Sequence, residues 1–155
     1  MNKSFTVKQI GKIERNGEPP KIILEEKYRP ALLEVDNFSH IRVVWWGHQY
    51  EQYRDQIDMQ MKPPYALEVQ TGLFATRSPV RPNPILVSTC KITGMDLKKG
   101  ILEVNQIDAF DDSPVLDLKV YFPTEDRVKD VVVPDRFKEW GDWIPEEGIE
   151  PEYYE

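Results

Sequence analysis

The sequence predicts a mainly β domain, closed as a barrel or stacked as a sandwich, with few and short helices. Apolar residues alternate with polar ones in most segments, as they do in strands with one buried face. These segments are rich in β-branched and aromatic residues, and helical periodicity is confined to two short stretches. The 155 residues are enough for one domain with a proper core.

Roughly seven segments read as strands. Within the tryptophan segment, alternation places Ile41, Val43 and Trp45 on one face. The polar run DLKKG at 96–100 ends in glycine between two strand candidates, so it predicts a hairpin turn. The strand candidates cover residues 5–13, 21–26, 41–48, 65–75, 85–95, 101–108 and 115–122.

Two stretches carry weak helical signals. EKYRPALLEV at 26–35 predicts a turn or two broken at Pro30, and PDRFKEWGDW at 134–143 predicts one short helix that ends at Gly141. Residues 145–155 hold five glutamates and no basic residue, so we expect an irregular acidic tail after a domain of residues 1–144.

Composition limits the possible functions. The formal net charge is −7, but residues 1–144 carry only −2 once the five tail glutamates are set aside, so a global basic field for nucleic acid is absent. The sequence contains no dinucleotide-binding glycine motif, no phosphate loop and no Cys-x-x-Cys or His-Glu-x-x-His motif, so no metal site is expected. One cysteine, no long apolar run and no signal-peptide pattern predict a cytoplasmic protein without a membrane span.

The loop TRSPVRPNP at 76–84 combines three prolines with Arg77 and Arg81. The prolines fix their own φ angles and push the residues before them toward extended geometry, so the loop is rigid before any ligand arrives. Its guanidinium groups suit carboxylates and phosphates, and few backbone amides remain as donors. The loop is either a binding loop or a stiff connector whose arginines lie in solvent.

Two further segments are unusually polar for strands. His40 and His48 lie eight residues apart, so an unbroken strand would project both from one face, as ligand groups or as buried histidines. Asp117 interrupts an apolar strand, and a buried carboxylate needs a partner such as arginine. Four aspartates, Asp108, Asp111, Asp112 and Asp117, surround a Ser-Pro turn, which by itself needs no function.

Together these segments resemble the TsaA-like family, tRNA methyltransferases that use S-adenosylmethionine to methylate N6 of threonylcarbamoyl-adenosine beside the anticodon. The matching stretches are FSHIRVVWWGH at 38–48, GLFATRSPVRPNPI at 72–85 and DAFDDSPVLDLKVYFP at 108–123. The resemblance implies a single-sheeted β-barrel and a homodimer with cofactor sites near the subunit interface.

The resemblance also implies roles for individual residues. Arg81 and Asn83 are expected to face the tRNA or to brace the site, and His40 and Asp117 are candidates for a general base. An alternative is that no base acts and the proton leaves after methyl transfer. The residues expected to contact the cofactor are His48, Gln49, Arg77, Val87, Asp108, Ala109, Phe110 and Asp111.

The chain departs from the family pattern at three places. A Pro-Arg-Gln triplet is missing from RNGEPPKIILEE, and Leu86 and Asp112 stand where the family has glycine. A methyltransferase of the same fold acting on a small molecule, and a non-catalytic module that binds the cofactor or a nucleotide, therefore stay open as alternatives.

Overall fold

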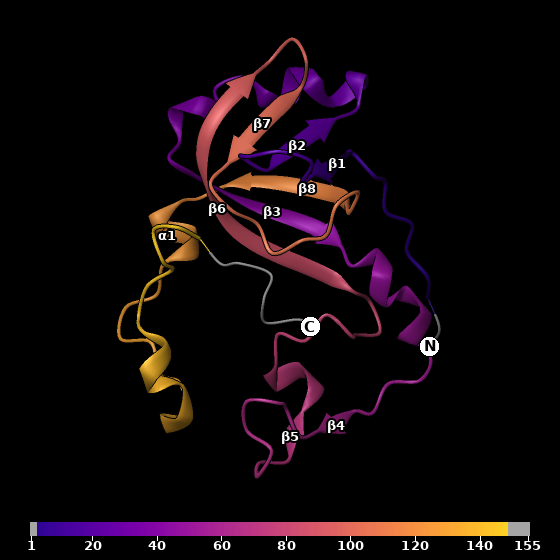
Figure 1. The fold of residues 1–155 in the computed structure, drawn as a ribbon, viewed down its shortest axis with the longest axis vertical. Coiled ribbons are helices and arrows are strands. Elements are labelled where there is room, and N and C mark those ends of the chain that lie inside the picture. The colour runs from indigo at the N-terminus through magenta and orange to yellow at the C-terminus, as the bar shows by residue number, and fades with distance from the viewer. Residues whose placement is uncertain (1–2, 149–155) are drawn as a thin grey trace.

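The computed structural model describes residues 3–148, and its main feature is a six-stranded antiparallel sheet (Figure 1). A second sheet is formed by the two-residue strands β4 (Gln60–Met61) and β5 (Thr71–Gly72). The main strands are β1 (Gly11–Glu14), β2 (Lys21–Leu24), β3 (His40–Trp46), β6 (Ile85–Asp96), β7 (Ile101–Val104) and β8 (Pro114–Val120).

The main sheet closes on itself through its pairing. The strands follow the order β1-β2-β7-β6-β3-β8, and β8 pairs back to β1 through Val115 and Gly11. Closure leaves no open edge along this sheet, which removes the usual template for strand addition. The mainly β class is confirmed, and the six main strands form one antiparallel sheet, while β4 and β5 pair only with each other.

The core lies inside the closed sheet and follows the predicted alternation. Ile41, Val43 and Trp45 of β3 are all buried, as the period-two pattern predicts. They meet inward residues of every other main strand, including Ile13 of β1 and Leu102 of β7. The alternating pattern therefore identified the inner face of β3 correctly.

Two predicted strands differ from the observed ones. Residues 65–75 form no long strand: they contain β5 and the 3₁₀ segment η4 (Leu73–Ala75). The first strand begins at Gly11 rather than at residue 5, because Phe5 and Val7 are exposed and strand pairing starts only at Gly11. In both places a short alternating run was not matched by a neighbouring strand that could pair with it.

The helical segments are short, as expected, and nearly all are 3₁₀. The turn across Pro30 is not broken, since η1 (Glu26–Leu32) continues through it. The hairpin at 96–100 is confirmed, with Gly100 at φ +70°. The remaining segments are η2 (Val35–Asn37), η3 (His48–Tyr53), α1 (Pro123–Asp126) and η5 (Asp135–Trp140).

The chain after β8 leaves the main sheet. In Figure 1, η5 lies beside the β4–β5 region, and Phe137 and Trp140 pack edge-to-face against Tyr65 with centroid separations of 5.6 and 5.3 Å. The chain then returns to the β7–β8 loop, where the Asn105 side-chain amide donates to the Glu146 carbonyl at 3.0 Å. Of the predicted tail at 145–155, residues 149–155 lie outside the described residues, and the domain boundary after 144 stays a prediction.

Among the described residues, no helix combines the length and apolar character that crossing a membrane requires.

Candidate functional site at one end of the closed sheet

A hollow lies where β3 and β6 meet the loops that follow β5 and β7. Its lining combines apolar and aromatic side chains with one carboxylate. Its composition, a few polar groups among apolar ones, is typical of a small-molecule site, and its volume of about 10 Å³ has room for only part of a ligand. The lining residues are Trp45, Tyr50, Pro79, Leu86, Asp108 and Phe110.

The carboxylate of Asp108 is held by a chain of two hydrogen bonds. The Ser88 hydroxyl donates to Asp108 Oδ1, and the indole nitrogen of Trp45 donates to Ser88 Oγ at 2.9 Å. Trp45 and Ser88 are buried at 3% and 8% exposure, so this chain is fixed by the core. Asp108 is therefore oriented before a ligand binds.

The aromatic wall depends on a glycine. A Cβ at Gly47 would lie 2.8 Å from Leu86 Cδ1 and 3.2 Å from Tyr50 Cδ2, so a larger residue here would displace two side chains that line the hollow. Tyr50 then packs against Phe110 with ring centroids 6.2 Å apart, and burial raises the pKa of the Tyr50 hydroxyl. The wall is apolar and its phenol stays protonated at neutral pH.

His48 and Gln49 begin η3 and line an open concavity together with Glu51 and Gln52. The strand ends at Trp46, so the expectation of one unbroken strand carrying both histidines on one face is wrong. The Nδ1 atom of His48 is buried and has no hydrogen-bond partner among the described residues. A buried ring nitrogen of this kind is costly unless a water or ligand completes it.

The arginine-proline loop uses most of its polar groups on itself. Arg77 Nη2 donates to the Val87 carbonyl at 3.2 Å, which brings together two residues assigned to the cofactor. Arg81 Nη1 donates to the carbonyls of Thr76 and Ser78 at 3.0 and 3.2 Å. Arg77 remains exposed beside the strand, whereas Arg81 braces the loop.

Asn83 is also engaged by the protein. Its Oδ1 accepts from Arg54 Nη2 at 3.1 Å, and Arg54 Nε donates to the Pro82 carbonyl at 2.7 Å. The amides of Val80 and Ile85 bond to Ser78 Oγ and to the Asn83 carbonyl. The loop is thus rigid through its own hydrogen bonds as well as through its prolines.

Beyond Phe110, the turn after Asp108 faces β1 rather than the hollow. Asp111 Oδ1 accepts from the Arg15 amide at 2.7 Å, and the Ala109 side chain is fully buried. Asp112 has φ +59° and pairs with Lys12 Nζ at 2.6 Å, which lowers the pKa of Asp112. The positive φ is the physical reason why glycine suits this position.

The two candidates for a general base do not line the hollow. His40 is at the far end of β3 from His48, about 20 Å along the strand at 3.3 Å per residue, and bonds Ser39 Oγ. The expectation that Asp117 is a buried carboxylate with an arginine partner is wrong. Its side chain is 49% exposed and pairs with Lys119 at 2.8 Å. Asp117 also pairs across the sheet with Val44, which alternates with the inward residues.

Sequence reasoning missed Ser88, Trp45 and Tyr50. Ser88 was visible as a polar residue at an inward position of an apolar strand, between Leu86 and Cys90. Burial raises the pKa of the neighbouring Cys90 thiol to about 12, with Asp108 adding to the effect. Within residues 3–148, no three histidine, cysteine, aspartate or glutamate side chains lie together as a group that could hold a metal ion.

Comparisons with known proteins identify the family of the chain. The tRNA-methyltransferase O N-terminal domain family matches residues 9–127. An S-adenosyl-L-methionine-binding protein of Archaeoglobus fulgidus is 36% identical over 108 residues, covering 70% of this chain and 73% of that one. A human tRNA (adenine(37)-N6)-methyltransferase is 31% identical over 104 residues, covering 67% of this chain and 23% of that one.

Solved structures resemble the whole fold. TrmO from Pseudomonas aeruginosa has a TM-score of 0.64 and 25% identity, covering 84% of this chain and 62% of that one. The chain thus spans about 62% of the length of that protein. Because the family match covers most of the chain, the chain belongs to the tRNA-methyltransferase O N-terminal domain family.

Proposed function

We propose that this protein is an S-adenosylmethionine-dependent methyltransferase that methylates N6 of threonylcarbamoyl-adenosine next to the anticodon of tRNA. The observation that carries the proposal is the placement of Asp108 in an aromatic hollow of a family member whose relatives bear S-adenosylmethionine-binding and tRNA-methyltransferase names. The tRNA substrate rests on more distant relatives, so it needs its own experiment.

The residues of the site fit this cofactor. Asp108 Oδ1 is bound by Ser88, and the carboxylate's remaining lone pairs can accept from a ribose hydroxyl. Arg77 offers an exposed guanidinium for the carboxylate of the cofactor. Tyr50 and Phe110 supply apolar contact for adenine, and the unpartnered Nδ1 of His48 offers one further polar contact.

The remaining assigned residues have supporting roles in the proposal. Gln49 and Val87 are neighbours of His48 and Arg77, while Ala109 and Asp111 hold the turn that carries Asp108 and Phe110. Arg81 and Asn83 brace the loop, and an exposed edge of either can still meet the tRNA backbone.

The bound cofactor would supply an activated methyl group on a sulfonium centre. The protein's part is then chiefly to hold acceptor and methyl in line, and alignment alone can supply much of the acceleration. The placement of His40 and Asp117 outside the hollow favours the route without a base, in which the proton leaves after transfer. Substitution of either residue tests this route: kcat should be unchanged, and a loss with intact cofactor affinity would restore that residue as the base.

Calorimetric titration with S-adenosylmethionine tests the first step. Arg77→Ala should weaken binding without unfolding the protein, and Lys119→Ala on the outer face serves as a matched control. Absence of binding to the wild-type protein at high cofactor concentration would contradict the proposal. Unchanged affinity in Arg77→Ala would remove only the role of that arginine.

Depletion of the protein in its host tests the substrate. Loss of the N6 methyl group on threonylcarbamoyl-adenosine in bulk tRNA is the expected result, detected by mass spectrometry of nucleosides. A methyltransferase acting on a small molecule is the second candidate, favoured by Leu86, which fills part of the hollow where the family has glycine. Unchanged tRNA together with intact cofactor binding would exclude the tRNA substrate and leave the small-molecule enzyme and the non-catalytic module.

Two further parts of the proposal concern assembly and activity. A homodimer is expected from the resemblance, and light scattering after size-exclusion chromatography measures it directly. A non-catalytic module would transfer no methyl group to any acceptor, so a radiolabel transfer assay that offers both tRNA and a small-molecule extract of the host separates it from either enzyme.

A further inference from the structure

Arg15, in the turn between β1 and β2, contacts the segment that carries Asp108 and Phe110. Its guanidinium donates from Nη1 to the carbonyls of Ile107 and Ala109, the latter at 3.2 Å. A third bond runs from Nη2 to the side-chain oxygen of Gln106 at 3.1 Å. One side chain therefore satisfies three acceptors in a stretch that has no strand partner.

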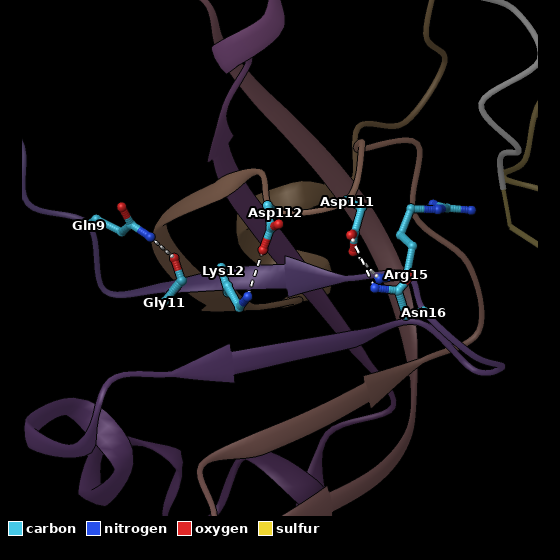
Figure 2. Close-up of polar contacts among 7 residues, drawn as sticks. All are labelled: Gln9, Gly11, Lys12, Arg15, Asn16, Asp111 and Asp112. Atoms are coloured by element: carbon cyan, nitrogen blue, oxygen red, sulfur yellow. Dashed lines mark hydrogen bonds and ion pairs between the residues drawn. The ribbon is translucent and has the colours of Figure 1, made fainter.

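The backbone of the same turn holds the other end of this segment. The Arg15 amide donates to Asp111 Oδ1 at 2.7 Å, and Asn16 Nδ2 donates to Asp111 Oδ2 at 3.4 Å. Figure 2 shows these contacts beside the separate Lys12–Asp112 ion pair on β1. The segment from Gln106 to Asp111 is thus attached to one turn at both of its ends.

The attachment decides which way the intervening side chains point. Ile107 and Ala109 are buried at 1% and 0% exposure, while Asp108 and Phe110 alternate with them and line the hollow. Fixing the carbonyls of Ile107 and Ala109 fixes the peptide plane that precedes Asp108 and the one that precedes Phe110. The guanidinium fork suits this task because its donors are planar and rigidly spaced.

We propose that Arg15 is a positioning residue of the ligand site, which acts by holding Asp108 and Phe110 in their binding orientation. It does not line the hollow itself, so its effect passes entirely through the segment that it holds. The proposal rests on the proposed function, because it assumes that the hollow binds S-adenosylmethionine. Preorganisation of this kind lowers the ordering cost that binding would otherwise incur.

The test compares Arg15→Ala with Lys12→Ala. Lys12 binds the same turn through Asp112, but this pair is exposed at 47% and 65% and lies beyond Asp111. Arg15→Ala should weaken S-adenosylmethionine affinity about tenfold or more, since small misplacements of site groups are costly. Lys12→Ala should bind within about twofold of the wild type, because exposed ion pairs contribute little.

Two readouts separate positioning from general stability. Amide hydrogen exchange of residues 106–113 should accelerate in Arg15→Ala, while the amides of β3 and β6 keep their wild-type protection. Methylguanidinium added to Arg15→Ala should restore part of the affinity, whereas methylamine should not. Arg15→Lys, which keeps the charge and loses the fork, replaces the alanine variant if that variant does not fold.

The outcomes distinguish the proposal from the function on which it rests. Wild-type affinity in a folded Arg15→Ala protein would overturn the positioning role. If the wild-type protein itself fails to bind S-adenosylmethionine, the proposed function falls, and exchange still decides whether Arg15 holds the segment. Unchanged amide exchange of residues 106–113 in Arg15→Ala would show that Arg15 does not hold this segment.

Discussion

Replacing Ser88 with alanine is expected to destabilise the protein by more than the loss of one hydroxyl usually does. The Ser88 hydroxyl stands between two groups, accepting from Trp45 Nε1 at 2.9 Å and donating to Asp108 Oδ1. Both Ser88 and Trp45 are buried inside the closed sheet, so water has little access to replace the first bond. Asp108 lies at the hollow, where water can replace the second.

The magnitude follows from these two losses. Leaving the Trp45 donor buried without an acceptor costs about 1–3 kcal/mol. The bond to Asp108 adds less, because that carboxylate is partly exposed and water compensates for it. The free energy of unfolding should therefore fall by about 2 kcal/mol in Ser88→Ala.

Urea unfolding of a mutant cycle measures the effect. Trp45→Phe removes the donor, so the double variant Trp45→Phe/Ser88→Ala has no buried donor without an acceptor at this position. The coupling free energy between the two sites should be about 1 kcal/mol, with the double variant more stable than additivity predicts. A Ser88→Ala protein within about 0.5 kcal/mol of the wild type, or strictly additive effects, would refute the reasoning.

Three further predictions follow from single contacts. Gly11→Ala should lower the free energy of unfolding by about 3 kcal/mol or prevent folding, because the new Cβ would overlap the Ile23 carbonyl of the paired strand. Urea unfolding measures this loss, and a variant as stable as the wild type contradicts the prediction. The thiol of Cys90, whose pKa burial raises to about 12, should react with a disulfide reagent at pH 8 only as fast as the protein opens, and fast labelling without denaturant would argue against it. The pKa of Asp126 is lowered chiefly by the Phe122 amide, so its stabilisation is present above about pH 4 and lost as the pH falls toward the lowered pKa. The stability difference between the wild type and Asp126→Asn should therefore shrink below about pH 4, and a difference that persists in acid contradicts the assignment.

The predictable part of the fold is the part that local alternation controls. The inner face of β3 was readable because Ile41, Val43 and Trp45 each bury a side chain at period two. Residues 65–75 show the same kind of pattern, yet only Thr71 and Gly72 form a strand, because only these two residues pair with a neighbouring strand. Pairing is a property of the whole chain, so no local window reports it.

The candidate site divides in the same way. Asp108 and Arg77 were assigned from motifs whose order along the chain resembles a known family, and the structure places Asp108 in the hollow and Arg77 against Val87. Ser88 and Arg15 were not assigned to the site. Ser88 bonds a residue about 20 positions away in the sequence, and Arg15 bonds one about 90 positions away. Their signals are one polar residue on an inward strand face and one arginine in an ordinary turn.

The sequence by itself determined the mainly β class, the inner face of β3, the hairpin at 96–100 and the stiffness of the arginine-proline loop. These depend on side-chain periodicity, glycine and proline, whose effects act within a few residues. Only the tertiary structure decided that Asp117 is exposed, that Arg81 and Asn83 brace their own loop, and that Arg15 holds the Asp108 segment. Such roles depend on which groups, far apart in the sequence, come within hydrogen-bond distance when the sheet closes. A short stretch of sequence does not contain that information.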